Sequence, residues 1–207
     1  DINGRSYFTV KTLLNGNVMS TSKITADKPR PSLGSGTEKD PYVIMSPEDL
    51  YLINYNMDSH FVLGADIDLT YDTQNENGLY YNGGDGWTAI GLNEGEAFSG
   101  SLDGYYNGEI HKIIGLNSTK YGLFFQIYSG DSTVNIKNII FEDCYFISSN
   151  AIAEFITGGY GGSVNVENIA VLNSNFSSGS NLIAKEIQSA GEDAVNIGVC
   201  TSVNPKS

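Results

Sequence analysis

Cysteine, basic residues and long apolar runs are all scarce in this 207-residue sequence. Cys144 and Cys200 are its two cysteines, too few for a disulfide scaffold and too far apart for a short-spaced zinc or redox motif, so we expect free thiols. Lysine and arginine total 11 against 24 acidic residues, and the net charge of −13 would repel nucleic acid. No run of about 18 apolar residues is present, which argues against insertion into a membrane.

The residues that are abundant indicate a globular, all-β domain. Hydrophobic residues make up 40% of the chain and charged residues 17%, which is enough apolar material for a folded core. After residue 60, apolar and polar residues alternate between turn clusters, as in residues 61–69, and this pattern is typical of strands. Helical signals occur at residues 46–53, where a serine cap precedes a proline and two acids, so we expect one short helix there.

Charge and proline divide the chain into three parts. Residues 1–30 carry a net charge of +3, with five basic and two acidic residues, whereas residues 31–207 carry −16, with six basic and 22 acidic residues. The first part is predicted to be a β arm that turns at Asn15-Gly16. We expect residues 31–36 to be a linker and residues 37–207 the main domain. The arm residues proposed to contact another subunit are Tyr7, Phe8, Val10, Lys11 and Leu13.

An internal repeat indicates how the strands are arranged. The sequence VNIKNI at residues 134–139 recurs as VNVENI at 164–169 and partly as VNI at 195–197, at offsets of 30 and 31 residues. Units of this length cannot bury an apolar face alone, so they must stack with equivalent positions in columns. A right-handed parallel β-helix satisfies this requirement, and residues 60–207 have room for about five or six coils.

The repeat also predicts particular neighbours across the stack. Ile136, Val166 and Ile197 should lie above one another inside the helix. The asparagines that precede them should form an outer column in which side-chain amides bond along the stack. Lys137 should lie beside Glu167, an opposite-charge pair worth roughly 0.2–1 kcal/mol.

Several further segments match a known family in order and spacing. They are GTEKDPYVI at residues 36–44, the helix at 47–53, GADIDL at 64–69, WTAIG at 87–91, FSGSLDG at 98–104, IIGL at 113–116 and YGLF at 121–124. With these segments the chain resembles bacterial surface and adhesin-like β-helices that carry GLUG-type repeats. The resemblance covers residues 36–202 and implies a right-handed parallel β-helix. It also implies a module of the kind found in cell-surface adhesins, protease pre-domains and phage particles.

Exposed aromatic residues are the first candidates for a binding site. Ring faces stack on sugars while hydroxyl groups bond to sugar edges, so an aromatic platform would suit a glycan. The loop at residues 72–86, rich in Asn, Gly and Tyr, is the expected contact point. The alternative is that Trp87 and about half of the tyrosines fill the interior. The candidate ligand-binding residues are Tyr80, Tyr81, Trp87, Tyr105 and Tyr106.

Acidic residues near the first strand are candidates for a weak calcium site. Asp66 and Asp68 leave the same face of a strand, and Asp72 follows closely. Carboxylate oxygens are the ligands that Ca²⁺ prefers, but the spacing lacks the pattern of a dedicated calcium loop. We therefore favour a structural role, in which these carboxylates bond to turn amides, and expect no obligatory cofactor.

Catalytic constellations are not evident in the sequence. Both arginines lie in the arm, and the coils contain no adjacent Asp pair of the kind a hydrolase would need. We expect His60 and His111 to be structural residues rather than general bases. The sequence therefore favours a non-enzymatic extracellular module for adhesion or display on a cell, virion or filament surface, binding a glycan or surface receptor. The alternative is a structural subunit that assembles with copies of itself through the arm, and a polysaccharide-degrading enzyme comes third.

Overall fold

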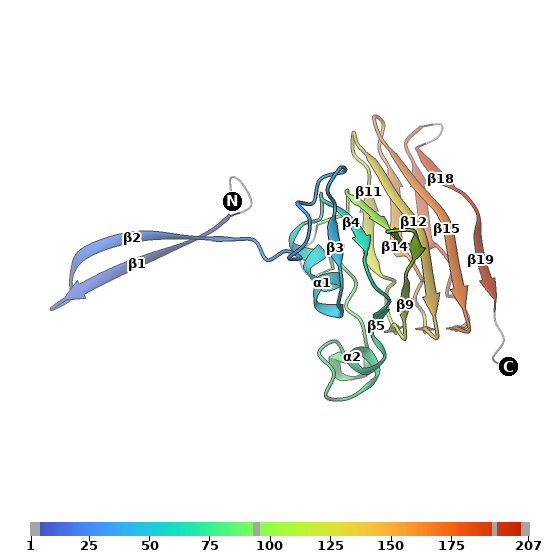
Figure 1. Ribbon diagram of the computed structural model, residues 1–207, viewed down its shortest axis with the longest axis horizontal. Coiled ribbons are helices and arrows are strands. Elements are labelled where there is room, and N and C mark those ends of the chain that lie inside the picture. The colour runs from blue at the N-terminus through green and yellow to red at the C-terminus, as the bar shows by residue number, and fades with distance from the viewer. Residues whose placement is uncertain (1–4, 93–95, 192–193, 204–207) are drawn as a thin grey trace.

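The computed structural model describes residues 5–92, 96–191 and 194–203, and within the first two strands it describes the side chains of residues 11–21. Its body is a parallel β-helix, in which strands from successive coils stack side by side (Figure 1). In its three stacked sheets the strands pair in parallel with the equivalent strands of neighbouring coils. The fold class predicted from the repeat is therefore confirmed.

The largest face of the β-helix is a nine-stranded sheet. Six of its strands follow the order β18-β15-β12-β6-β4-β3, and β5, β9 and β19 pair beside them. The strands are β3 (Tyr42–Ile44), β4 (His60–Leu63), β5 (Ile67–Asp68), β6 (Ser101–Asp103), β9 (Lys112–Ile114), β12 (Thr133–Glu142), β15 (Ser163–Leu172), β18 (Val195–Ile197) and β19 (Cys200–Val203).

Two smaller sheets of three strands each close the coils. One contains β10 (Asn117–Ser118), β13 (Tyr145–Phe146) and β16 (Asn175–Phe176), and the other contains β11 (Phe124–Tyr128), β14 (Ala153–Gly158) and β17 (Ala184–Ser189). The solenoid thus has about three full turns. The expectation of five or six coils was wrong because residues 69–92 and 96–100 form short helices, loops and isolated bridges in place of regular strands.

The predicted columns are present in the stack. Ile136 pairs with Val166, which pairs with Ile197. The first two are fully buried, while Ile197 lies in the last described coil and is half-exposed. Each aliphatic side chain removed from water in this way stabilises the fold by roughly 1.5–3 kcal/mol. The interior column is thus a main source of stability.

Lys137 and Glu167 are neighbours in the register, as predicted. The ion pair that Lys137 makes is nevertheless with Asp103 in the preceding coil, where Nζ lies 3.4 Å from Oδ2. The predicted neighbour is therefore confirmed, while the ion pair of Lys137 is with the coil on the other side. A long lysine side chain can reach the strand on either side, and here it contacts the carboxylate of the earlier coil.

Asparagine and aspartate form the corners of the coils. Asn138 and Asn168, 30 residues apart, have φ angles of 56° and 54°, in the left-handed region that asparagine tolerates better than most residues. Asp143 and Asn173 repeat the pattern at the next corner, with φ angles of 53° and 51°. These left-handed residues interrupt the extended backbone in the middle of β12 and β15 and again directly after each strand.

Short helices flank the first coils. The predicted helix is present as α1 (Pro47–Tyr51) followed by the 3-10 helix η1 (Leu52–Tyr55), and Ser46 Oγ caps it by accepting from the amide of Asp49 at 3.2 Å. A second α-helix, α2 (Thr70–Gln74), and the 3-10 helix η2 (Asn82–Gly84) were not predicted. The expectation of a single helix was therefore wrong.

The arm is an antiparallel hairpin of β1 (Arg5–Leu14) and β2 (Asn17–Asp27) that projects from the body (Figure 1). Its turn is Asn15-Gly16, as predicted, and both residues have positive φ, which favours this tight connection. Residues 31–36, expected to be a linker, instead lie against the first coil. Pro31 is buried, and the carbonyl of Leu33 accepts from the amide of Val43 at 3.0 Å.

Both cysteines are free, as predicted. Cys144 is fully buried, and this burial raises the pKa of its thiol to about 12. Cys200 pairs in register with Ile169 of β15, so the two cysteines do not share a column.

Candidate functional site

Trp87 belongs to the interior of the molecule. Its side chain is only 3% exposed, and Nε1 donates to the carbonyl of Leu123 at 3.2 Å. Tyr80 contacts its ring edge-on at a centroid distance of 5.1 Å and stacks on Tyr51 at 5.4 Å. Trp87 therefore cannot offer a ring face to a ligand, and its proposed place in an exposed platform is wrong.

The other proposed platform residues lie on two separate elements. Tyr81 is half-buried and comes just before η2. Tyr105 and Tyr106 form β7 (Tyr105–Tyr106), which pairs with β8 (Glu109–Ile110) in a small hairpin inserted into one coil. Tyr105 is exposed and remains available to a ligand. Burial, with smaller contributions from the carboxylates of Glu48 and Asp72, raises the pKa of Tyr80 far above its ordinary value.

The proposed calcium ligands bond to backbone amides. Oδ1 of Asp66 accepts from the amide of Lys112 at 2.9 Å, and Oδ1 of Asp68 accepts from the amide of Thr70 at 2.9 Å. Asp72 contacts the amide of Leu79 at 3.4 Å. Within the described part of the chain, no three His, Cys, Asp or Glu side chains converge as a metal site would require.

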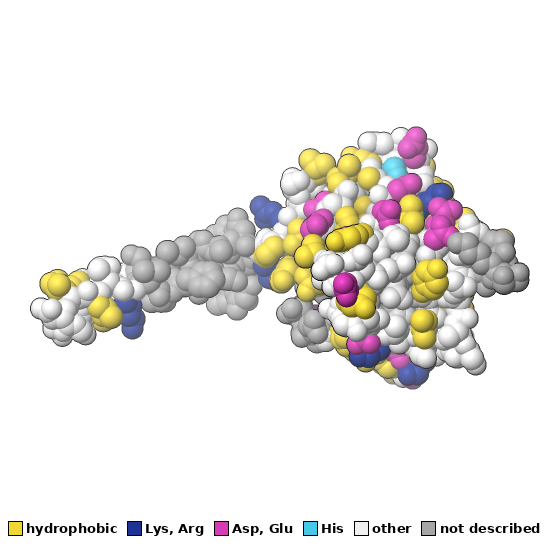
Figure 2. All heavy atoms as spheres, turned by 90° about the horizontal axis from the view of Figure 1, so that it is seen from below, with side chains coloured by type: hydrophobic (Ala, Val, Ile, Leu, Met, Phe, Trp, Pro, Cys, Tyr) yellow, Lys and Arg dark blue, Asp and Glu magenta, His cyan; other side chains and the backbone are white. Residues whose placement is uncertain are grey.

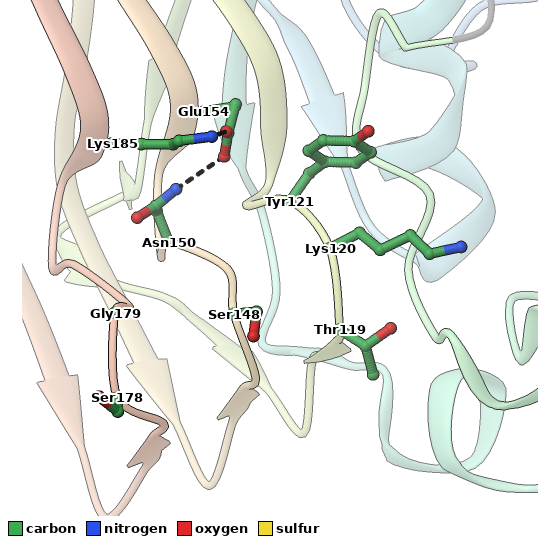
Figure 3. A pocket seen from close by; sticks show the side chains of 9 residues that line it. All are labelled: Thr119, Lys120, Tyr121, Ser148, Asn150, Glu154, Ser178, Gly179 and Lys185. Carbon is green, nitrogen blue, oxygen red and sulfur yellow. Dashed lines mark hydrogen bonds and ion pairs between the residues drawn. The ribbon is translucent and has the colours of Figure 1, made fainter.

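A polar groove of about 390 Å³ lies on the side of the solenoid that carries β14 and β17 (Figure 3). We call it the Glu154 groove. Three successive coils contribute to it at equivalent places, because each supplies the segment that leads into its strand of this sheet. The lining residues are Thr119, Lys120, Tyr121, Ser148, Asn150, Glu154, Ser178, Gly179 and Lys185.

Glu154 is a charged side chain held almost entirely out of water. It is 5% exposed, and it keeps its charge compensated through two partners (Figure 3). Lys185 Nζ lies 2.7 Å from Oε1, and Asn150 Nδ2 donates to Oε2 at 3.0 Å. The hydrogen bond to Glu154 and its charge raise the pKa of the Lys185 ammonium. Asn150 is fixed in turn, because its Oδ1 accepts from both the backbone and side-chain nitrogens of Asn181.

The opposite wall of the Glu154 groove comes from residues 119–121. Lys120 Nζ forms an ion pair with Asp85 at 2.6 Å, which raises the pKa of the lysine and lowers that of the carboxyl group. The ring of Tyr121 packs edge-on against Phe125 at a centroid distance of 5.2 Å. The groove therefore combines two compensated charge pairs with hydroxyl groups and one aromatic ring.

A larger groove of about 950 Å³ crosses the outer face of the nine-stranded sheet. We call it the His60 groove. Nδ1 of His60 and Oγ of Ser101 are 2.7 Å apart, and the next residue in this row, Asn135, accepts from Asn165 in the following coil. The groove also includes the Lys137–Asp103 ion pair. His111, the other histidine, lies elsewhere, with Nδ1 3.6 Å from Oδ1 of Asp66.

Sequence reasoning did not identify the Glu154 groove. Apart from Glu154 and Lys185, its residues lie in segments that lead into strands, where no single motif marks them. The signal that points to it is the repeat itself, because Glu154 and Lys185 occupy equivalent positions in strands that pair in parallel. Aligning the coils one below another would have placed these opposite charges side by side.

Comparison with known proteins says little about the site of this chain. No family model and no solved structure matches the chain. Among curated proteins, halomucin from Haloquadratum walsbyi (strain DSM 16790 / HBSQ001) is 32% identical over 126 residues, which cover 58% of this chain. The match spans only 1% of halomucin, so the chain corresponds to a very small part of that protein. In the described residues, no helix has the length and apolar character needed to cross a membrane.

Proposed function

We propose that this chain is a non-enzymatic module of a surface protein that serves adhesion or display by binding a glycan or a surface receptor. The observation that carries the proposal is the stacking of equivalent polar side chains from successive coils into grooves on a parallel β-helix. Such a scaffold holds the binding groups in place before the ligand arrives, so no loop has to become ordered when the ligand binds. The fold and the similarity to halomucin both fit a surface module.

The proposal places the module outside the cell, on a cell, virion or filament surface. No family model matches the chain, so its membership among GLUG-repeat β-helices remains a proposal that rests on the sequence resemblance. Calcium has no assigned role, because the acidic residues considered for it already accept backbone N–H groups. Nucleic acid is not a proposed partner, since residues 31–207 carry a net charge of −16.

A glycan array probed with the purified chain tests the binding function. We expect retention on a restricted set of glycans and no cleavage of those glycans during incubation. A chain that binds neither any arrayed glycan nor intact cells would contradict the proposal. Release of free sugar from the array would instead support the third interpretation, a polysaccharide-degrading enzyme.

A second function, self-assembly through the arm, is favoured by the hairpin tip. Leu13, Leu14, Val18 and Met19 are all more than half exposed there, around the turn at Asn15-Gly16. Lys11 is exposed in the same hairpin, and residues 31–207 carry a net charge of −16. Acidic side chains are visible on the face of the body shown in Figure 2. The side chains of Tyr7, Phe8 and Val10, also proposed for this contact, lie outside those that the structure describes. An apolar, basic tip suits a contact with the acidic body of another copy.

A further inference from the structure

We propose that the Glu154 groove binds a neutral saccharide through two adjacent hydroxyl groups. This inference rests on the proposed function and assigns to it a site and a ligand class. Its starting point is the pairing of Glu154 with Lys185 at 2.7 Å on the groove wall. A sugar hydroxyl can donate to a carboxylate and accept from an ammonium, so a carboxylate beside an ammonium matches two neighbouring hydroxyls.

The hydrogen-bonding capacity of this pair exceeds the bonds it makes within the protein. Each carboxylate oxygen has two lone pairs, and Oε1 and Oε2 of Glu154 accept from Lys185 and Asn150 respectively. An ammonium has three N–H donors, and one of those on Lys185 serves Glu154. Lys185 lines the groove and its side chain is well exposed, so its remaining donors are accessible to a ligand. The pair is therefore fixed in geometry and still able to bond to a ligand.

The geometry of the pair is set before any ligand arrives. Asn150 is 2% exposed, and its Oδ1 accepts from the backbone nitrogen and the side-chain nitrogen of Asn181 at 3.1 and 3.0 Å. Asn150 in turn holds Oε2 of Glu154. A carboxylate held by neighbouring coils loses little conformational freedom on binding, which favours affinity for a small polar ligand.

The rest of the lining suits a sugar ring. Tyr121 lies across from Glu154 in Figure 3, on the segment supplied by an earlier coil. An aromatic ring on a groove wall can pack against the C–H face of a pyranose. Ser148 and Ser178 add hydroxyl groups that can donate and accept, and Thr119, whose hydroxyl donates to Asp85, can accept. The volume of about 390 Å³ lies within the range of small-molecule sites.

Charge selects a neutral ligand over an acidic one. Both lysines of the groove are already paired with carboxylates, Lys185 with Glu154 and Lys120 with Asp85. The lining therefore has no excess positive charge, and the net charge of −16 over residues 31–207 would repel uronic or sialic acids.

Saturation-transfer NMR on the full chain tests the inference, with glucose, galactose and mannose as neutral probes and glucuronate as the acidic probe. We expect at least one neutral sugar to bind and glucuronate not to bind. Lys185→Met and Tyr121→Ala should each weaken the affinity for the neutral sugar by about tenfold or more, as truncation of a central contact residue does in other binding sites. Lys137→Met in the His60 groove is the matched control and should bind as the parent does. Glu154→Gln should also lose binding, but its buried position makes the two more exposed variants the decisive ones.

The inference is overturned if the neutral sugar binds all variants equally, if glucuronate binds better, or if no neutral sugar binds the parent chain. These outcomes leave the proposed function standing if glycans on the array are still retained, and they then assign recognition to another surface. A chain that binds neither the arrayed glycans nor intact cells would instead contradict the proposed function itself.

Discussion

Asn165 donates a hydrogen bond from Nδ2 to Oδ1 of Asn135, the equivalent residue of the preceding coil, over 2.9 Å. Asn196 makes the same bond to Asn165 from the following coil, also over 2.9 Å. The column expected from the repeated Val-Asn pattern is thus continuous across three coils. Because the amide of Asn165 both donates and accepts, a change at this central position affects the coils on both sides.

Replacing Asn165 with alanine should therefore destabilise the fold. The variant loses two side-chain hydrogen bonds, and we expect the free energy of unfolding to fall by about 1–3 kcal/mol. Urea denaturation followed by circular dichroism measures it. Asn77→Ala, in an exposed loop outside the stack, is the control and should stay within about 0.5 kcal/mol of the parent. Equal effects of the two substitutions would show that the column does not stabilise the stack.

Asn168 should be required for its backbone conformation as well as for its side chain. Its φ of 54° is unfavourable for alanine, whereas glycine adopts it freely. Both substitutions remove the bond from Asn168 Nδ2 to Asn138 Oδ1. We expect Asn168→Ala to be less stable than Asn168→Gly by about 1 kcal/mol in thermal or urea unfolding. Glycine proving the more damaging replacement would contradict the corner geometry.

Cys144 should resist thiol reagents in the folded protein. Burial raises its pKa from 9.0 to about 12, so at pH 8 the thiol is protonated as well as inaccessible. Cys200 is only partly buried and should be alkylated first, which mass spectrometry of digested protein can show. Rapid native labelling of Cys144 would contradict its placement in the core.

The same pKa difference makes stability depend on pH. The pKa of this thiol is higher in the folded state than in the unfolded state. Its full contribution to the free energy of unfolding is therefore present below the unfolded pKa of about 9. The contribution is lost as the pH rises from about 9 towards 12. Cys144→Ala should flatten this part of the stability profile, while Cys200→Ala, whose pKa is also raised by burial but at a less buried site, should change it less.

The arm decides between the two proposed functions. If the chain is an adhesion or display module, light scattering should report a monomer at all concentrations, with or without residues 1–30. If the arm joins subunits, the parent should assemble with increasing concentration, and Leu13→Ser with Met19→Ser should prevent assembly. High salt should weaken that assembly as well, because the arm is basic and the body acidic.

The elements that could be predicted from the sequence are those that repeat or carry strong local signals. The columns through Asn135 and Ile136 followed from the period, the cap at Ser46 from its motif, and the turn at Asn15-Gly16 from its residues. Helix α2 has no such pattern. It depends on tertiary bonds that no local signal contains, such as the one from Thr73 Oγ1 to the carbonyl of Gly115 at 3.0 Å.

The candidate site was less predictable than the fold for a related reason. Aromatic content suggested a platform, but composition does not distinguish an exposed ring from one that fills the core, and Trp87 proved to be buried. The Glu154 groove depends on which residues of different coils become neighbours. Such neighbours are found by aligning the second strand of each repeat as well as the first, which places Glu154 beside Lys185.

The most direct test of the account is a disulfide between the two charged residues that the stack brings together. In a Cys200→Ser background, the Glu154→Cys/Lys185→Cys pair lies on adjacent parallel strands, within the separation that a disulfide can span. Oxidation should give a mass lower by about 2 Da and no new reactive thiols. The control pair Glu154→Cys/Gln188→Cys is three residues out of register, about 10 Å further along the strand, and should stay reduced. Two free thiols in the first pair, or an equally ready bond in the control pair, would contradict the parallel stacking on which both the fold and the groove depend.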